Sequence, residues 1–188
     1  IVKYGVGIND ADYDVHPRVG TIRQLCPIYN CWGNMLARCY SPAHLRRRPS
    51  YIGCSVAPEW HRFSVFKAWM ESQNWQGMAL DKDILVPGNR VYGPDACAFV
   101  SNTLNAFVVE RTAGRGEWPL GVSWIERLGR FQAYCKNPFT KKQVYLGLYV
   151  DPQAAHLAWR KQKHTFALQL AEFETDQRLI AALSTRYA

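Results

Sequence analysis

Apolar side chains recur every three or four residues in two stretches of the first half of the chain. This spacing places them on one face of an α-helix, so it predicts helices over 27–40 and from Pro58 to about residue 70. A proline at the first helical position suits the start of the second helix. The stripes, which form the candidate core of this half, contain Tyr29, Trp32, Met35, Leu36, Cys39, Trp60, Phe63, Phe66, Trp69 and Met70.

Shorter segments separate and follow these two helices. The polar residues 41–50 predict a loop, and apolar runs over 78–86 and 97–100 predict two short strands. Ser101 is a candidate N-cap for a further helix that runs through to Val109. The first half of the chain therefore combines helices with a pair of strands.

A different rhythm begins after residue 120, where apolar and polar positions alternate. Alternation is typical of half-buried strands, and turn residues separate the three segments that show it. The three predicted strands cover 121–125, 130–136 and 143–149. Asp151 and Pro152 fit the N-cap and first position of a long helix to about residue 173, and a short last helix is expected after it.

These elements predict an α+β fold with two modules. The first covers 1–110, with an N-terminal arm over 1–24, and the second covers 120–188. Residues 111–119 contain glycines and a proline but little apolar content, which indicates a linker. The second module is expected to be a three-stranded antiparallel sheet packed on one long helix, with a helical tail. One face of such a sheet stays uncovered.

The charge of the chain suggests its class of partner. It has 188 residues, 23 of them basic and 15 acidic, for a formal net charge of +8. This excess favours a polyanion such as double-stranded DNA. A hydrophobic content of 48% excludes a disordered chain. No apolar run approaches the roughly 20 residues that span a bilayer, and no signal-peptide pattern opens the sequence, so no membrane partner is expected.

Six cysteines allow two interpretations. The chain is long and rich in aromatic residues, and it has no Cys-x-x-Cys pair, so a disulfide framework is not needed. Free, mostly buried thiols in a reducing cytoplasm are the first interpretation. The second is a structural zinc ion, because four thiolates form a valid ligand set. The candidate zinc ligands are Cys26, Cys39, Cys54 and Cys97.

The predicted C-terminal sheet is basic, with polar and aromatic side chains along it. A narrow sheet of this kind suits the DNA major groove, where every base pair presents a distinct pattern of donors and acceptors. A solvated basic face is the alternative. Four motifs occur here in order: GVSW at 121–124, GRFQA at 129–133, YLGLY at 145–149 and AAHLAW at 154–159.

On these motifs the C-terminal module resembles the AP2 domain, a family known from plant transcription factors and phage endonucleases. The resemblance implies a sheet docked in the major groove. Trp124, Phe131 and Trp159 are expected in the core and not at the DNA. The implied DNA contacts are Ser123, Ile125, Arg127, Arg130, Tyr134, Lys136, Gln143 and Tyr145. Lys141 and Lys142, in the predicted turn between Lys136 and Gln143, extend this expected interface. The plant domains are rich in arginine at these positions, so their target sequence is not carried over.

The N-terminal module has a resemblance of its own. Its motifs are WGNMLARCY at 32–40, WHRF at 60–63, LDKD at 80–83, YGPDACAFV at 92–100, and Asn105. In this order they resemble phage HNH-type homing endonucleases, whose genes often carry an AP2 domain downstream. The resemblance implies a ββα scaffold around one divalent ion, Mg²⁺ or Mn²⁺, and a protein that works in the cytoplasm of a phage host.

Phosphodiester cleavage needs a general base and a metal ion. The resemblance implies that Asp81 is a metal ligand and that Asn105 completes the site from the helix. Lys82 stands where the family has its general base His, and Ala96 stands at the second motif position. A neutral lysine is a poor base unless it is buried, and alanine cannot bind a metal. Asp83 and Asn89 are candidate replacement ligands; alternatively, Asp81 and Asp83 form a charged strand end or cap a loop.

A run of three arginines, Arg46, Arg47 and Arg48, lies in the predicted loop. Such residues position a protein on DNA by binding phosphates, or they form a solvated loop. Three functions stay open at this point. They are a metal-dependent, site-recognising DNA endonuclease, a DNA-binding regulator or adaptor that has lost catalysis, and a protein-binding inhibitor that uses exposed aromatic residues.

Overall fold

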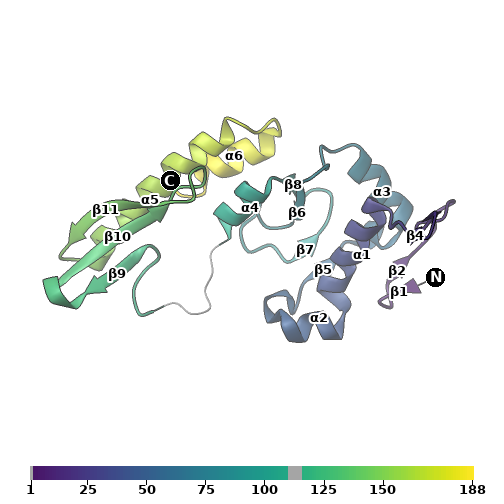
Figure 1. The fold of residues 1–188 in the computed structure, drawn as a ribbon, viewed down its shortest axis with the longest axis horizontal. Coiled ribbons are helices and arrows are strands. Elements are labelled where there is room, and N and C mark those ends of the chain that lie inside the picture. The colour runs from purple at the N-terminus through teal and green to yellow at the C-terminus, as the bar shows by residue number, and fades with distance from the viewer. Residues whose placement is uncertain (1, 110–115) are drawn as a thin grey trace. The chain divides into compact units, whose positions relative to one another are not determined.

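The computed structural model describes residues 2–109 and 116–188, and it shows an α+β protein (Figure 1). The chain forms two compact units, Ile1–Ser101 and Asn102–Ala188. Each unit has its own cluster of buried apolar side chains. Within the described residues, no helix combines the length and the apolar composition that crossing a bilayer requires.

The helices of the first unit are α1 (Pro27–Tyr40), α2 (Pro42–Arg47), α3 (Phe63–Glu71) and two 3-10 turns, η1 (Pro49–Tyr51) and η2 (Pro58–His61). The helix predicted over 27–40 is confirmed, and the second predicted helix is divided into η2 and α3. The prediction of a loop over 41–50 is wrong for α2. Ser41 caps that helix, since its Oγ accepts a hydrogen bond from the His44 backbone N–H at 3.4 Å.

Trp32 of α1 lies at the centre of the first core, fully buried. Its ring centroid lies 5.5 Å from that of Phe63 on α3. Its indole Nε1 donates a hydrogen bond to the Trp60 carbonyl oxygen at 2.8 Å. A buried indole N–H needs such a partner, so this contact ties the middle of α1 to the start of the α3 region.

The strands of the first unit are short. They are β1 (Val2–Lys3) with β2 (Gly7–Ile8), β3 (Arg18–Val19) with β4 (Ile22–Arg23), β5 (Ser55–Val56) parallel to β7 (Val91–Tyr92), and β6 (Ala79–Asp81) antiparallel to β8 (Ala98–Val100). Two small hairpins therefore occupy much of the predicted arm. The strand predicted over 78–86 ends at Asp81, because the carboxylate of that residue turns the chain.

The second unit contains the predicted three-stranded sheet. Its strands β9 (Val122–Ile125), β10 (Arg130–Lys136) and β11 (Gln143–Tyr149) are antiparallel in the order β11-β10-β9. The 3-10 turn η3 (Glu126–Leu128) joins β9 to β10. The helices α5 (Pro152–Ala171) and α6 (Gln177–Thr185) follow. Asp151 caps α5 as predicted, because its Oδ2 accepts from the Ala154 backbone N–H at 2.9 Å.

The helix α4 (Asn102–Val108) belongs to the second unit. The Phe107 and Tyr187 ring centroids lie 5.8 Å apart. Lys163 Nζ lies 3.6 Å from the Phe107 ring centroid and donates to the Phe107 carbonyl oxygen at 2.6 Å. The structural boundary therefore precedes α4, whereas the sequence placed it at the linker over 111–119. Of that predicted linker, 111–115 lie outside the described residues.

Gly121 gives a test of the packing between sheet and helix. Its φ is +76°, and a Cβ there would overlap the ring of Trp159, which is 7% exposed on α5. We expect Gly121→Ala to lower the free energy of unfolding by about 2–4 kcal/mol, from left-handed backbone strain and overpacking together. Urea denaturation measures this loss.

Gly129→Ala is the matched control. Gly129 has a φ of +59° but no atom near the position of an added Cβ. We expect the control to lose about 1–2 kcal/mol, the cost of backbone strain alone. Equal losses in the two variants would contradict the proposed contact between Gly121 and Trp159.

Candidate nucleic-acid interface

The central strand β10 divides its side chains between the two faces of the sheet. Phe131, Ala133 and Cys135 are buried, and the first two pack with Ala155 of α5. Side chains alternate along a strand. Arg130, Gln132, Tyr134 and Lys136 therefore point away from the helix.

The register of the neighbouring strands extends this uncovered side. On β9, Ser123 lies opposite Gln132 and Ile125 opposite Arg130. On β11, Gln143 lies opposite Lys136, Tyr145 opposite Tyr134, and Leu148 opposite Gln132. We call this side of the sheet the outer face; it contains Ser123, Ile125, Arg130, Gln132, Tyr134, Lys136, Gln143, Tyr145 and Leu148. Seven of these nine residues were implied by the AP2 resemblance, and one face brings them together.

Five cations lie at the two ends of the outer face: two on the face itself and three in the turns next to it. Arg130 is at one end of β10, beside Arg127 in η3, and Lys136 is at the other end. Lys141 and Lys142 lie in the turn next to Lys136, and both are exposed. Within the described residues none of these five cations forms an ion pair; Lys141 Nζ donates only to Thr103 Oγ1, at 3.3 Å.

The middle of the outer face is polar and aromatic. The rings of Tyr134 and Tyr145 lie 5.4 Å apart, centroid to centroid. Gln132 Nε2 donates a hydrogen bond to Tyr134 Oη at 2.7 Å. The resemblance did not point to Gln132, although its alternation with Arg130 and Tyr134 on the same strand was visible in the sequence.

A β-bulge places Tyr145 on the outer face. The register of β11 against β10 slips between Ala133 and Tyr134, so that Leu146 is an extra residue. Gly147 next to it has a φ of +125°, a conformation that side-chain-bearing residues rarely adopt. Without the bulge, strict alternation would turn Tyr145 toward the helix.

Trp124 departs from its predicted place in the core. It is 40% exposed, with its ring 4.7 Å from that of Phe131. β9 is an edge strand of the sheet, so Trp124 has sheet on one side only. Phe131 and Trp159 are buried as predicted.

Asp81, the candidate metal ligand, ends β6 in the first unit. Its Oδ1 accepts hydrogen bonds from the backbone N–H groups of Asp83 at 2.9 Å and Ile84 at 2.7 Å. Burial raises the pKa of the Asp81 carboxyl, and the neighbouring Asp83 raises it further. These bonds are those of a loop-capping aspartate, which is the second of the two interpretations that the sequence allowed.

Lys82, which stands at the position of the family's general base, is held in the same loop. Its Nζ donates to Asp83 Oδ2 at 2.9 Å and to the Asn89 carbonyl oxygen at 2.8 Å, and its side chain is only 12% exposed. Asn89 returns a bond from Nδ2 to the Lys82 carbonyl oxygen at 2.6 Å. The ammonium group therefore acts as a donor that closes the loop between β6 and β7.

The other candidate catalytic residue lies in the second unit. Asn105 is on α4, two residues before Phe107, and is partly exposed. Asp81 and Lys82 belong to the first unit. The HNH resemblance expects all three residues at one site, and that expectation stays a prediction.

The four candidate zinc ligands are all free cysteines. Among the described residues, no three His, Cys, Asp or Glu side chains form a group that could hold a metal ion. Burial raises the pKa of the Cys39 and Cys97 thiols to about 12.

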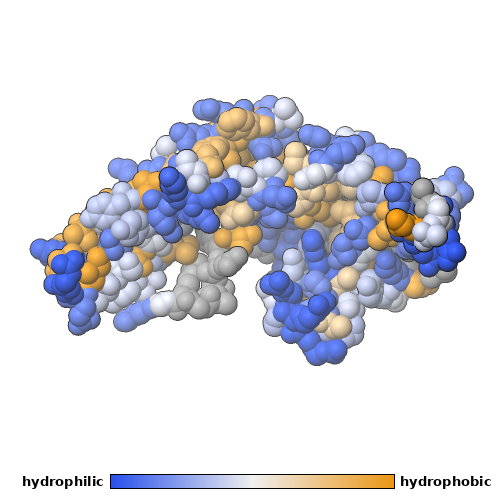
Figure 2. All heavy atoms as spheres, viewed as in Figure 1, coloured by the Kyte–Doolittle hydropathy of each residue, from blue (hydrophilic) through white to orange (hydrophobic). Residues whose placement is uncertain are grey.

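The candidate phosphate contacts Arg46, Arg47 and Arg48 are exposed at the end of α2. No ion pair involves them within the part of the chain that is described. Burial lowers the pKa of His44, and Arg47 is the strongest of the guanidinium groups that lower it further. Figure 2 shows mostly hydrophilic residues at the position of α2, at the lower edge of the view.

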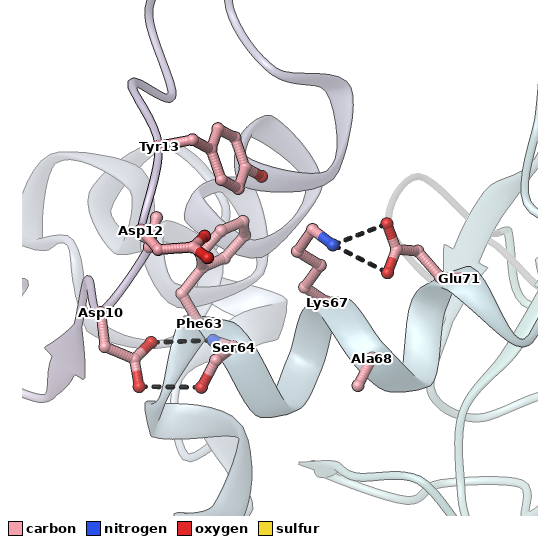
Figure 3. Close-up of a pocket in the computed structure, with 9 residues that line it drawn as sticks. Asp10, Asp12, Tyr13, Phe63, Ser64, Lys67, Ala68 and Glu71 are labelled. Carbon is pink, nitrogen blue, oxygen red and sulfur yellow. Dashed lines mark hydrogen bonds and ion pairs between the residues drawn. The ribbon is translucent and has the colours of Figure 1, made fainter.

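A pocket of about 290 Å³ lies elsewhere in the first unit (Figure 3). Three carboxylates, from Asp10, Asp12 and Glu71, line it together with Lys67. Lys67 is paired with Glu71 at 2.8 Å, and Asp10 accepts from Ser64 Oγ at 2.8 Å. The excess of negative charge makes this pocket unsuitable for phosphate.

No known protein family matches the sequence, and no curated protein or solved structure matches the chain. The resemblances to AP2 domains and HNH endonucleases therefore stay predictions. What the structure adds is the common face on which the residues of the first resemblance lie.

Asp81 provides a test of its role in the loop. A carboxyl whose pKa is raised by folding favours its neutral form, so its ionisation destabilises the protein as pH rises from about 4 through the folded-state value. We expect Asp81→Asn to be at least as stable as wild type at pH 7, and its advantage to shrink in acid. Asp81→Ala removes the acceptor and should cost about 1–2 kcal/mol.

Urea denaturation between pH 3 and pH 7 measures these differences. Asp95→Asn is the control, because Asp95 is an exposed aspartate in the segment between β7 and β8, and it should change stability little. If Asp81→Asn proved as destabilising as Asp81→Ala at neutral pH, the negative charge itself would be needed, and the loop-capping interpretation would fall.

Proposed function

We propose that this protein binds double-stranded DNA, with the outer face of the β9–β11 sheet in the major groove. The observation that carries the proposal is the distribution of chemistry on this face. Cations occupy its two ends, hydrogen-bonding and aromatic groups occupy its middle, and the three strands contain no acidic residue. Phosphates attract the first kind of group, and base edges pair with the second.

The dimensions of the sheet fit this arrangement. Six residue steps separate Arg130 from Lys136, which is roughly 20 Å along the strand. Three strands are about 10 Å across, and the major groove is about 12 Å wide. A sheet lying in the groove would then bring its cationic ends toward the bordering phosphates while its middle faces the bases.

The charge of the second unit supports the same partner. Its described residues include ten Lys and Arg against six Asp and Glu. The exposed arginines Arg46, Arg47 and Arg48 offer a further phosphate-binding patch in the first unit. Such contacts add affinity without sequence preference.

Cleavage of DNA by the first unit is a separate proposal, and the set of side chains that could bind a metal ion there argues against it. One oxygen of Asp81 is bonded to two backbone N–H groups, and one oxygen of Asp83 is paired with Lys82. Ala96 has no side-chain atom that could bind a metal ion. With Lys82 in place of the family's base and no ligand from Ala96, this set is incomplete for a catalytic Mg²⁺ or Mn²⁺ ion. A DNA-binding regulator or adaptor is therefore the form of the proposal that the geometry supports best.

Salt-dependent binding tests the interface. We expect Arg130→Ala and Lys136→Ala each to weaken binding to duplex DNA several-fold. Each should also reduce the slope of log affinity against log salt by about 0.9 for every phosphate that the variant no longer neutralises. Fluorescence anisotropy over a range of salt concentrations measures both quantities.

Lys161→Ala is the matched control, because it removes one exposed cation from α5 on the covered side of the sheet. It should leave the affinity nearly unchanged. Equal effects of all three substitutions would mean that DNA senses only net charge. Binding that salt does not weaken would favour a protein-binding role, with exposed aromatics such as Phe139 and Phe173 at the interface.

A plasmid assay decides the question of cleavage. We expect supercoiled plasmid to stay intact with Mg²⁺ or Mn²⁺ at protein concentrations that give a gel shift, because Lys82 is held in the loop and Ala96 supplies no metal ligand. Nicking by the wild type that is abolished in Asp81→Ala would establish the endonuclease and replace the regulator proposal.

A further inference from the structure

Gln132 holds the central position of the outer face. It lies on the middle strand, with Ser123 beside it on β9 and Leu148 beside it on β11. It is partly buried between these neighbours, whereas Arg130 and Lys136 toward the ends are exposed. A sheet seated in the major groove would present this residue to the bases rather than to the phosphates.

The side-chain amide of Gln132 is oriented before any ligand arrives. Its Nε2 donates to Tyr134 Oη at 2.7 Å. The Tyr134 ring is itself held against Tyr145, which the bulge at Leu146 brings to this face. An amide fixed in this way loses less conformational freedom on binding than a free glutamine does.

The bond to Tyr134 uses one of the two N–H groups of the amide. One N–H and the carbonyl oxygen stay available in the plane of the amide. They lie side by side when Tyr134 accepts from the N–H that points away from the oxygen. Adenine offers the complementary pair in the major groove, the N7 acceptor and the N6 amino donor. Guanine places the O6 acceptor where the amide carbonyl would lie, and the pyrimidines offer only one of the two groups.

Leu148 adds an apolar contact next to the amide. It is 43% exposed and lies directly across from Gln132. The methyl group of thymine is the apolar feature of the major groove. An amide and an exposed leucine side by side therefore complement an A·T pair better than a G·C pair.

We propose that Gln132 is the specificity-determining residue of the sheet, that it reads the adenine of an A·T pair through a two-bond contact, and that Tyr134 is its positioning residue. This inference rests on the proposed function, since it names the base that the outer face reads. It assigns no role to the first unit.

The experiment selects binding sites for the full chain from a randomised duplex pool and then measures affinity for the selected site. We expect one adenine position whose replacement by any other base weakens wild-type binding about tenfold, which is within the range for one two-bond contact. Replacing that adenine by 7-deazaadenine, which lacks N7, should weaken wild-type binding as well.

Three variants test which residues produce the adenine preference. Gln132→Ala should lose the preference at that one position and its sensitivity to 7-deazaadenine, while its salt dependence stays that of wild type. Tyr134→Phe keeps the ring but removes the acceptor, so it should retain part of the preference. Gln153→Ala, an exposed glutamine on α5, is the control and should select the wild-type site. Circular dichroism confirms that each variant is folded.

The outcomes separate this inference from the proposed function. If Gln132→Ala keeps the adenine preference at every selected position, or if selection yields a guanine there, the inference is overturned while DNA binding stands. If the wild-type chain fails to bind any duplex at low salt, the proposed function fails and the inference with it. Loss of the preference in Gln132→Ala alone, with the control unchanged, supports both.

Discussion

The burial of every second side chain of β10 against α5 is the constraint on which the proposed interface depends. Phe131, Ala133 and Cys135 lie in the core, and the pleat of the strand then directs their neighbours outward. A slip of one residue would exchange the two sets and place Arg130 and Lys136 under the helix. The cost of burying unpaired charges holds the register, so the same hydrophobic contacts that stabilise the unit also expose its cations.

Polar groups serve different purposes in the two units. In the first, Asp81, Lys82 and Asn89 form their hydrogen bonds with one another and with nearby backbone groups. In the second, the cations of the outer face have no carboxylate partner among the described residues. A polar residue that is already bonded within its loop must break those bonds to act on a ligand. The outer face needs no such rearrangement, and this difference is why the proposed function rests on the sheet.

A residue can match a family motif and still have a structural role. Asp81 lies at the end of the strand where the HNH resemblance expects a metal ligand, yet its Oδ1 caps the following turn. Three of the candidate zinc ligands, Cys39, Cys54 and Cys97, are buried in the aromatic core cluster. In both cases the residue type was visible in the sequence, whereas its bonding partners were not.

The sequence by itself determined the elements with a regular pattern: α1, the three strands of the sheet, and α5 with its Asp151 cap. Their periods and caps depend on residues close together in the chain. Only the tertiary structure decided that α4 packs with the second unit, that Leu146 forms a bulge, and that Gln132 is bonded to Tyr134. Membership of α4 depends on contacts with Lys163 and Tyr187, more than fifty residues away along the chain. Contacts between segments that are distant in the sequence determine which unit such a helix joins. The local spacing of apolar residues contains no information about those contacts.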